Sequence, residues 1–209
     1  MSPHPAWIPL FPLNTVLFPG GVLPLRVFET RYMDMVRECM KNGQSFGVVR
    51  ILTGSEVGRA AEPDLVGCVA HIVDWSMPEM GVLMLRTLGG ARFRILEKRV
   101  LKDQRQEARI ELIEEDDRAA LVDDAHLASA AALKSIIEEI NRKGRAEQGT
   151  DFISPFDEPA QLDNAGWVAN RWCEILPVPL AAKQKLLELD DVQSRLDIVY
   201  RYLQQHKIV

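Results

Sequence analysis

The chain has 209 residues, of which 47% are hydrophobic and 26% are charged, and it carries a formal net charge of −5 at pH 7. A chain of this length and composition buries an ordinary hydrophobic core, which excludes a fibrous repeat and a disordered chain. The negative charge argues against a dedicated nucleic-acid binder, because phosphate binding needs a concentrated basic surface.

From the start of the given sequence we expect no secretory signal. Residues 1–7 lack the basic start and the apolar run of a secretory signal. No apolar stretch approaches the roughly 20 residues that cross a bilayer. We therefore expect a cytoplasmic protein with no membrane partner.

The first half of the chain has the pattern of β-strands. Up to about Ile113 the apolar residues come in short runs or alternate with polar residues, and glycine and proline separate the runs. The candidate strands are Ile8–Leu13, Phe46–Leu52, Val66–Trp75, Val82–Thr87, Phe93–Leu101 and Ala108–Ile113. The pattern predicts a mostly antiparallel β-structure.

One helix is expected to interrupt these strands and to close one end of the sheet. Thr30 is a residue type that caps a first helical turn, and Gly43 permits the left-handed conformation that ends a helix. The residues that share its apolar face are Tyr32, Val36, Cys39 and Met40.

The second half of the chain has a helical pattern. After the acidic run at 114–117, which we interpret as a solvated connector, Leu133, Ile136, Ile137 and Ile140 form a stripe before Gly144. A second helix is expected up to Ile175, where Pro177 and Pro179 end it because proline cannot donate a backbone hydrogen bond. The further predicted elements are a loop over 145–159 and helices over 183–187 and 192–204, the last capped by Asp190 or Asp191.

These patterns predict an α+β fold in two parts. Residues 1–117 would form a β subdomain and residues 118–209 an α-helical subdomain, which together make one unit. Trp75, Trp167 and Trp172 are expected to anchor the core, although an exposed tryptophan would suit a recognition hot spot.

The residue types that catalyse reactions or bind metals are scattered. Cys39, Cys68 and Cys173 are far apart and odd in number, which favours buried thiols over a disulfide framework or a zinc site. The histidines at 4, 71, 126 and 206 lack ligand spacing, and Cys68 and His71 lie on opposite faces of an ideal strand. Phosphate-loop, zinc-protease and serine-hydrolase motifs are absent. We therefore predict no catalytic, cofactor-binding or metal-binding residues.

The best candidate for a nucleic-acid surface begins at Arg92 and Arg94, which share one face of a strand. Basic and acidic residues alternate after them: Glu97, Lys98, Arg99, Lys102, Asp103, Arg105 and Glu107. Because acidic residues interrupt the basic ones and no aromatic side chain is available for base stacking, a solvated hairpin is favoured. RNA binding around Arg92 and Arg94 is the alternative.

The segment from Ile8 to Tyr32 contains, in order, a Leu-Phe-Pro strand, a Phe-Pro-Gly turn, a Pro-Leu-x-x-Phe-Glu segment and an Arg-Tyr helix start. It resembles the opening signature of the Lon protease N-terminal domain family. The resemblance continues at Phe46–Val48, Val66–Ala70, Gly89–Arg94, Leu176–Leu180 and Lys183–Leu187. From the residues alone, Glu29 is placed to pair with an arginine at the start of the helix, so an architectural role is favoured.

The resemblance implies a PUA-like β pseudo-barrel followed by a helical bundle. In full-length Lon this domain captures unfolded or damaged proteins, while an ATPase module and a Ser-Lys protease follow it. Residue 209 comes before either module, so we expect no enzymatic activity. We predict a polypeptide-binding or adaptor module, linked to protein quality control, that binds through apolar surface on the barrel or between the barrel and the helices. The sequence does not identify the partner-binding residues or the oligomeric state.

Overall fold

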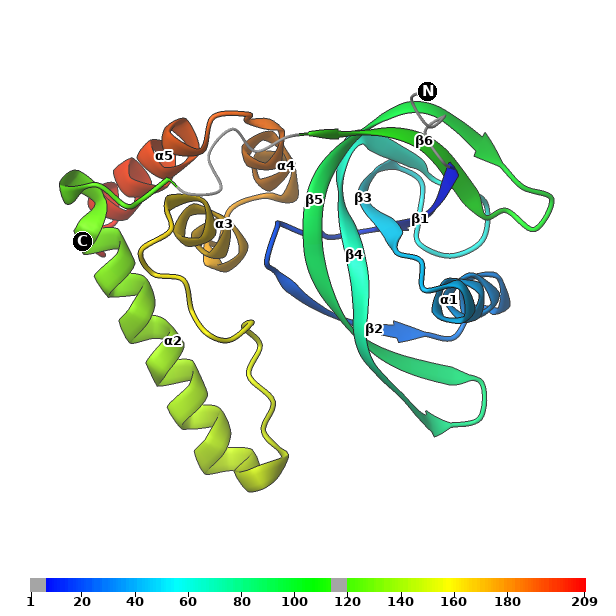
Figure 1. The fold of residues 1–209 in the computed structure, drawn as a ribbon, viewed down its shortest axis with the longest axis horizontal. Coiled ribbons are helices and arrows are strands. Elements are labelled where there is room, and N and C mark those ends of the chain that lie inside the picture. The colour runs from blue at the N-terminus through cyan, green and yellow to red at the C-terminus, as the bar shows by residue number, and fades with distance from the viewer. Residues whose placement is uncertain (1–6, 114–119) are drawn as a thin grey trace. The chain divides into compact units, whose positions relative to one another are not determined.

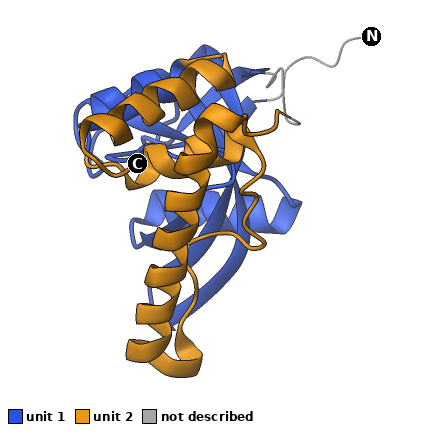
Figure 2. Ribbon diagram, turned by 90° about the vertical axis from the view of Figure 1, so that its left-hand side faces the viewer, with its two compact units in different colours: residues 1–114, 178–188 blue, residues 115–177, 189–209 orange. Residues whose placement is uncertain are grey.

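The computed structural model of the protein, described for residues 7–113 and 120–209, contains two compact units (Figures 1 and 2). Of the described residues, the first unit contains 7–113 and 178–188, and the second contains 120–177 and 189–209. The acidic run at 114–117, the predicted boundary at residue 117 and His4 lie outside the described residues.

The first unit is built on one mixed sheet. Its described strands are β1 (Trp7–Leu13), β2 (Val22–Val27), β3 (Phe46–Thr53), β4 (Glu62–Glu79), β5 (Val82–Val100) and β6 (Gln106–Ile113). The order is β2-β5-β4-β3-β1-β6, and β6 also pairs with β5, so that β1, β3, β4, β5 and β6 close into a ring. The pairing of β1 with β3 is parallel and the other pairings are antiparallel, which confirms the α+β class and the mostly antiparallel sheet.

A single strand, β5, replaces the two short strands predicted over 82–87 and 93–101. Gly89 and Gly90 suggested a break between two strands, but they lie within β5 where other parts of the chain approach it closely. A Cβ at Gly89 would collide with the carbonyl oxygen of Phe18, and a Cβ at Gly90 would collide with the ring of His71. The sequence pattern also missed β2, where the exposed Pro24 lies in a strand that pairs with β5.

The apolar face of α1 (Thr30–Asn42) packs into the main core of this unit. The core residues of α1 are Tyr32, Met33, Met35, Val36 and Cys39, and they join Phe11, Leu25, Phe46 and Leu85 from the strands. The helix ends at Gly43, whose φ of 61° confirms the predicted left-handed stop. The predicted cap at Thr30 is wrong, because the N-cap is Glu29 and it makes no side-chain capping bond.

A helix from the second half of the sequence, α4 (Leu180–Glu188), belongs to the first unit, whereas the sequence pattern grouped it with the helical subdomain. Two hydrogen bonds attach it to the sheet. Gln184 Nε2 donates to the carbonyl oxygen of Val66 at 3.0 Å, and Arg92 Nη1 donates to that of Leu187 at 2.7 Å.

The second unit consists of helices and their connections. Its described elements are the short 3-10 helices Asp124–His126 and Gly149–Asp151, and the α-helices α2 (Leu127–Gln148), α3 (Ala165–Ile175) and α5 (Val192–Gln205). Asp191 caps α5 by accepting a hydrogen bond from the Ser194 N–H at 2.7 Å, as predicted. The first part of the predicted loop over 145–159 is helical, because α2 continues through Gly144. The ring of Phe152 occupies the space that a side chain at position 144 would need.

The tryptophans divide between core and surface. Trp172 is buried and its Nε1 donates to the carbonyl oxygen of Ser129 at 3.0 Å, and Trp167 is also buried, so both anchor the core as predicted. Trp75 is 51% exposed, and its prediction as a core anchor is wrong. None of the helices in the described part of the chain combines the length and the apolar character needed to span a membrane.

Candidate functional site

The predicted arginine face does not form, because Arg92 is buried. Its side chain has 0% exposure, and its guanidinium donates to the carbonyl oxygen of Leu187 on α4. Arg94 is exposed. The two arginines therefore do not make a joint basic surface, and Arg92 is a structural residue that ties α4 to the sheet.

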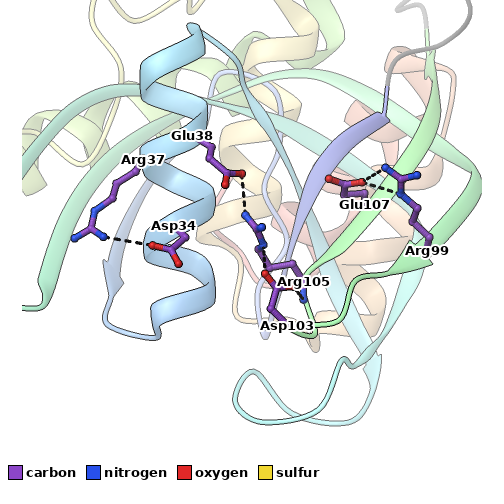
Figure 3. A network of polar contacts seen from close by, with 7 residues as sticks. All are labelled: Asp34, Arg37, Glu38, Arg99, Asp103, Arg105 and Glu107. Atoms are coloured by element: carbon purple, nitrogen blue, oxygen red, sulfur yellow. Dashed lines mark hydrogen bonds and ion pairs between the residues drawn. The ribbon is translucent and has the colours of Figure 1, made fainter.

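Four other basic side chains of this region, Lys98, Arg99, Arg105 and Arg109, pair with carboxylates, and Figure 3 shows the pairs of Arg99 and Arg105. Arg105 contacts Asp103 at 2.6 Å and reaches Glu38 of α1 at 2.8 Å, and Arg99 contacts Glu107 at 2.5 Å. Although desolvation acts in the opposite direction, the hydrogen bonds from Arg105 lower the pKa of Asp103. Lys98 pairs with Glu62 and Arg109 with Glu97 in the same way. The pairing favours a charge-balanced hairpin over an electrostatic surface for phosphates.

The cysteines are free and buried, as predicted. Burial raises the pKa of the Cys39 thiol to about 11, and the neighbouring Glu38 raises it further while Arg105 lowers it. The thiol is therefore protonated at neutral pH and unsuited to nucleophilic attack. Cys68 donates to the carbonyl oxygen of Gly90 at 3.3 Å.

Two histidines make contacts that the sequence did not indicate. His71 is exposed, and its Nδ1 lies 2.7 Å from the hydroxyl of Ser45. His126, in the second unit, is buried between Asp123 at 2.5 Å and Asp197 at 2.9 Å. Within residues 7–113 and 120–209, histidine, cysteine and acidic side chains form no group of three or more that is arranged to hold a metal ion.

Exposed apolar side chains gather on the β4–β5 hairpin beyond the point where β3 ends its pairing with β4. In Figure 1 this hairpin projects from the sheet, beside α1. The exposed fractions are 52% for Val73, 51% for Trp75, 46% for Met77 and 98% for Met80. These four residues are called the hairpin patch below. Its signal in the sequence, apolar residues alternating with Asp74 and Ser76, is also that of an ordinary half-buried strand.

A groove of about 510 Å³ runs beside the hairpin patch. It lies between the end of α1 with its following turn and residues 71–75 of β4, and we call it the hairpin groove. Met40 and Ile72 pack against the main core and, together with Val73 and Trp75, contribute apolar side chains to the lining of the groove. The Ser45–His71 pair and the carboxylate of Asp74 supply polar groups to its lining. The lining therefore combines apolar side chains with several polar groups, and a concave site of this mixed kind is suited to binding.

A smaller groove, of about 240 Å³, is lined by the signature segment itself. Arg31 contacts Glu29 at 3.1 Å, which confirms the predicted pairing of Glu29 with an arginine. The same guanidinium donates to the carbonyl oxygens of Gln104 and Glu56, so Arg31 holds two loops in place. Phe28, 55% exposed, is the largest apolar side chain that this groove presents to solvent.

A closed sheet that carries an exposed apolar hairpin beside a groove is typical of a binding module. The chain belongs to the family of the ATP-dependent protease La (LON) substrate-binding domain, whose family model matches residues 7–205. The resemblance seen in the sequence is thereby confirmed.

Relatives of known name and solved structures agree with this assignment. The chain is 31% identical to a Lon protease of Anaeromyxobacter dehalogenans and 28% identical to Lon protease 2 of Myxococcus xanthus, over 97% of its length in both cases. It spans 24% of the length of each of these proteases. A crystal structure of a Lon N-terminal domain protein from Xanthomonas campestris matches 94% of this chain and 98% of that chain, with a TM-score of 0.74 and 32% identity. The N-terminal domain of a Mycobacterium avium complex Lon protease matches 96% of this chain and all of that one, with a TM-score of 0.61; the 17% identity shows a shared fold alone.

Proposed function

We propose that the protein is a non-catalytic recognition module that binds non-native polypeptide chains through the hairpin patch and the hairpin groove. The carrying observation is the gathering of Val73, Trp75, Met77 and Met80 on one projecting hairpin. Large apolar side chains exposed together on one hairpin are costly to leave in water and mark a candidate interaction site. The apolar side chains that unfolded proteins expose are the matching ligand.

The residue types of the hairpin patch support a partner that varies in sequence. Methionine is unbranched and flexible, so it adapts its shape to different apolar ligands. Trp75 adds a large rigid surface of the type that contributes most binding energy in protein interfaces. Two adaptable side chains and one rigid one suit a site that recognises apolar character rather than one exact sequence.

The finer proposals rest on the family resemblance. They are the adaptor role in protein quality control, the cytoplasmic location, the absence of enzymatic activity, and the likeness of the two units to a PUA-like pseudo-barrel and a helical bundle. The RNA-binding alternative has less support, because Arg92 is buried and several neighbouring cations pair with carboxylates.

The test uses fluorescence anisotropy with labelled α-lactalbumin, once reduced and carboxymethylated so that it stays unfolded, and once native. A triple variant with Trp75, Met77 and Met80 changed to serine is compared with a matched control in which Leu96, Val100 and Leu112 are changed to serine. The control removes three apolar side chains that are 52–56% exposed from β5 and β6, close to the exposure of Trp75 and Met77. Truncation of a hot-spot tryptophan such as Trp75 costs about 2 kcal/mol or more, so we expect the hairpin variant to lose at least about tenfold in affinity.

Two results would count against this function. The first is equal binding of the hairpin variant and the control variant. The second is binding of the native and unfolded forms of α-lactalbumin with the same affinity. RNA binding is tested in parallel with a labelled single-stranded RNA, and it requires an affinity that falls steeply as salt rises.

A further inference from the structure

Among residues 7–113 and 120–209, no strand pairs with one edge of β4 beyond Ala70. β3 pairs with β4 from Glu62 to Ala70, whereas the following part of β4, up to Glu79, pairs within the described chain with β5 alone. A strand edge of this kind presents backbone N–H and C=O groups at alternate residues, ready to pair with another extended chain. The edge borders the hairpin groove, which is lined by residues 71–75 of the same strand.

The side chain of Asp74 covers one backbone group of this strand. Its Oδ1 accepts a hydrogen bond from the N–H of Trp75 at 2.8 Å. Alternate N–H groups of a strand point to opposite edges, and we infer that the Trp75 N–H points to the free one. Asp74 is itself exposed, so its carboxylate can turn to water when another acceptor approaches.

The free edge is short. A register shift between Ile72 and Asp74 bends the strand at its inner end, and Pro78, which has no N–H, limits it at the tip. The stretch from Asp74 to Met77 is left for pairing. An edge of this length forms few hydrogen bonds, which suits reversible binding.

The other sheet edge in this unit offers less. β2 pairs with β5 along Val22–Val27, and its outer edge contains Pro24 at an exposed position. Proline removes the backbone donor there, as in other strand edges that are protected against pairing.

Charge also selects the occupant of the β4 edge, because Asp74 is the one acidic side chain lining the hairpin groove. A segment with several carboxylates would be repelled.

We propose that the hairpin groove receives an extended, apolar polypeptide segment without acidic residues, which adds as a β-strand to the free edge of β4 over Asp74–Met77, and that Asp74 guards this edge. The proposal rests on the proposed function and specifies how the polypeptide is held. Backbone hydrogen bonds supply affinity that is independent of side-chain sequence, and Val73 and Trp75 of the groove lining accept the apolar side chains. Alternate side chains of the added strand face the groove.

The test uses a short labelled peptide, blocked at both ends, in which valine and threonine alternate and no residue is charged. Two further versions carry N-methyl groups on every second residue, one on the even positions and one on the odd positions. In an added strand only one of these sets of amides faces β4. We expect one methylated version to lose at least about tenfold in affinity and the other to bind like the parent peptide, because each lost hydrogen bond costs a few-fold.

Two variants of Asp74 test whether its carboxylate competes with an added strand for the N–H of Trp75. Asp74→Ala frees the Trp75 N–H, and it should tighten binding of the uncharged peptide by about threefold to tenfold, the effect of one hydrogen bond that no longer competes. Asp74→Asn keeps an oxygen acceptor at the same place and should bind like the wild-type protein. Asp34→Ala on α1, at a position outside the groove lining, controls for the loss of one negative charge.

The outcomes separate this inference from the proposed function. Equal affinity of all three peptides, or equal weakening of both methylated versions, overturns strand addition while leaving the hairpin patch as a binding surface. Equal affinity of the Asp74→Ala and Asp74→Asn variants overturns the guard role. If neither the parent peptide nor unfolded α-lactalbumin binds, the proposed function itself fails.

Discussion

Replacing Arg92 with alanine should destabilise the first unit, because Arg92 connects α4 to the sheet. The guanidinium is completely buried and donates to the carbonyl oxygen of Leu187 at 2.7 Å. A hydrogen bond from a charged donor contributes about 1.5–3 kcal/mol, and a large-to-small change at a buried site adds a cavity cost of about 2–5 kcal/mol. Since these terms overlap, we expect a loss of about 3–5 kcal/mol in the free energy of unfolding.

The assay is thermal unfolding followed by circular dichroism, with Arg94→Ala as the matched control. For a protein of this size each kcal/mol lowers the Tm by about 2–4 °C, so Arg92→Ala should lower it by about 6–20 °C. The exposed Arg94 should change stability by less than about 0.5 kcal/mol when truncated. Equal Tm values for the two variants would refute the structural role of Arg92 and restore the arginine face as a candidate surface.

Two further predictions concern titratable groups. Because the pKa of Cys39 is raised to about 11, the folded state holds this proton more tightly than the unfolded chain, and stability should fall as pH rises from about 9 to about 11. Denaturant unfolding across this range should show a smaller decline in Cys39→Ala, and an unchanged decline would contradict the burial of the thiol. At α5, hydrogen bonds from Ser194 lower the pKa of Asp191, so the stability that this cap contributes is present at neutral pH and lost as pH falls below about 4. Asp191→Ala should therefore lower the Tm near pH 7 and leave it unchanged near pH 2, whereas the same loss at both pH values would mean that the charge of the cap is irrelevant.

Local chemistry explains which elements the sequence predicts well. Gly43 ends α1 and Asp191 caps α5, because a left-handed turn and an N-terminal acceptor depend on residues within one helical turn. The family signature from Ile8 to Tyr32 is also local, since its prolines and glycines belong to successive turns and strands.

The candidate site depends on contacts between distant parts of the chain, and the sequence pattern could not supply them. The alternation around Trp75 is the same whether one strand face is buried or the strand projects into water. The sequence pattern around Arg92 is that of a surface cation. In the structure, α4, which follows some ninety residues later in the chain, contacts its guanidinium. Gly89 and Gly90 resemble a turn, although the strand continues because neighbouring groups approach it closely.

Hydrogen exchange tests most directly whether the hairpin holds the polypeptide. Backbone exchange is measured for the protein alone and with saturating reduced, carboxymethylated α-lactalbumin. We predict slower exchange confined to residues 71–80 of the hairpin and to the turn after α1 that lines the hairpin groove. Protection centred on Arg94 and β6, or no change at the hairpin under saturating conditions, would contradict the account.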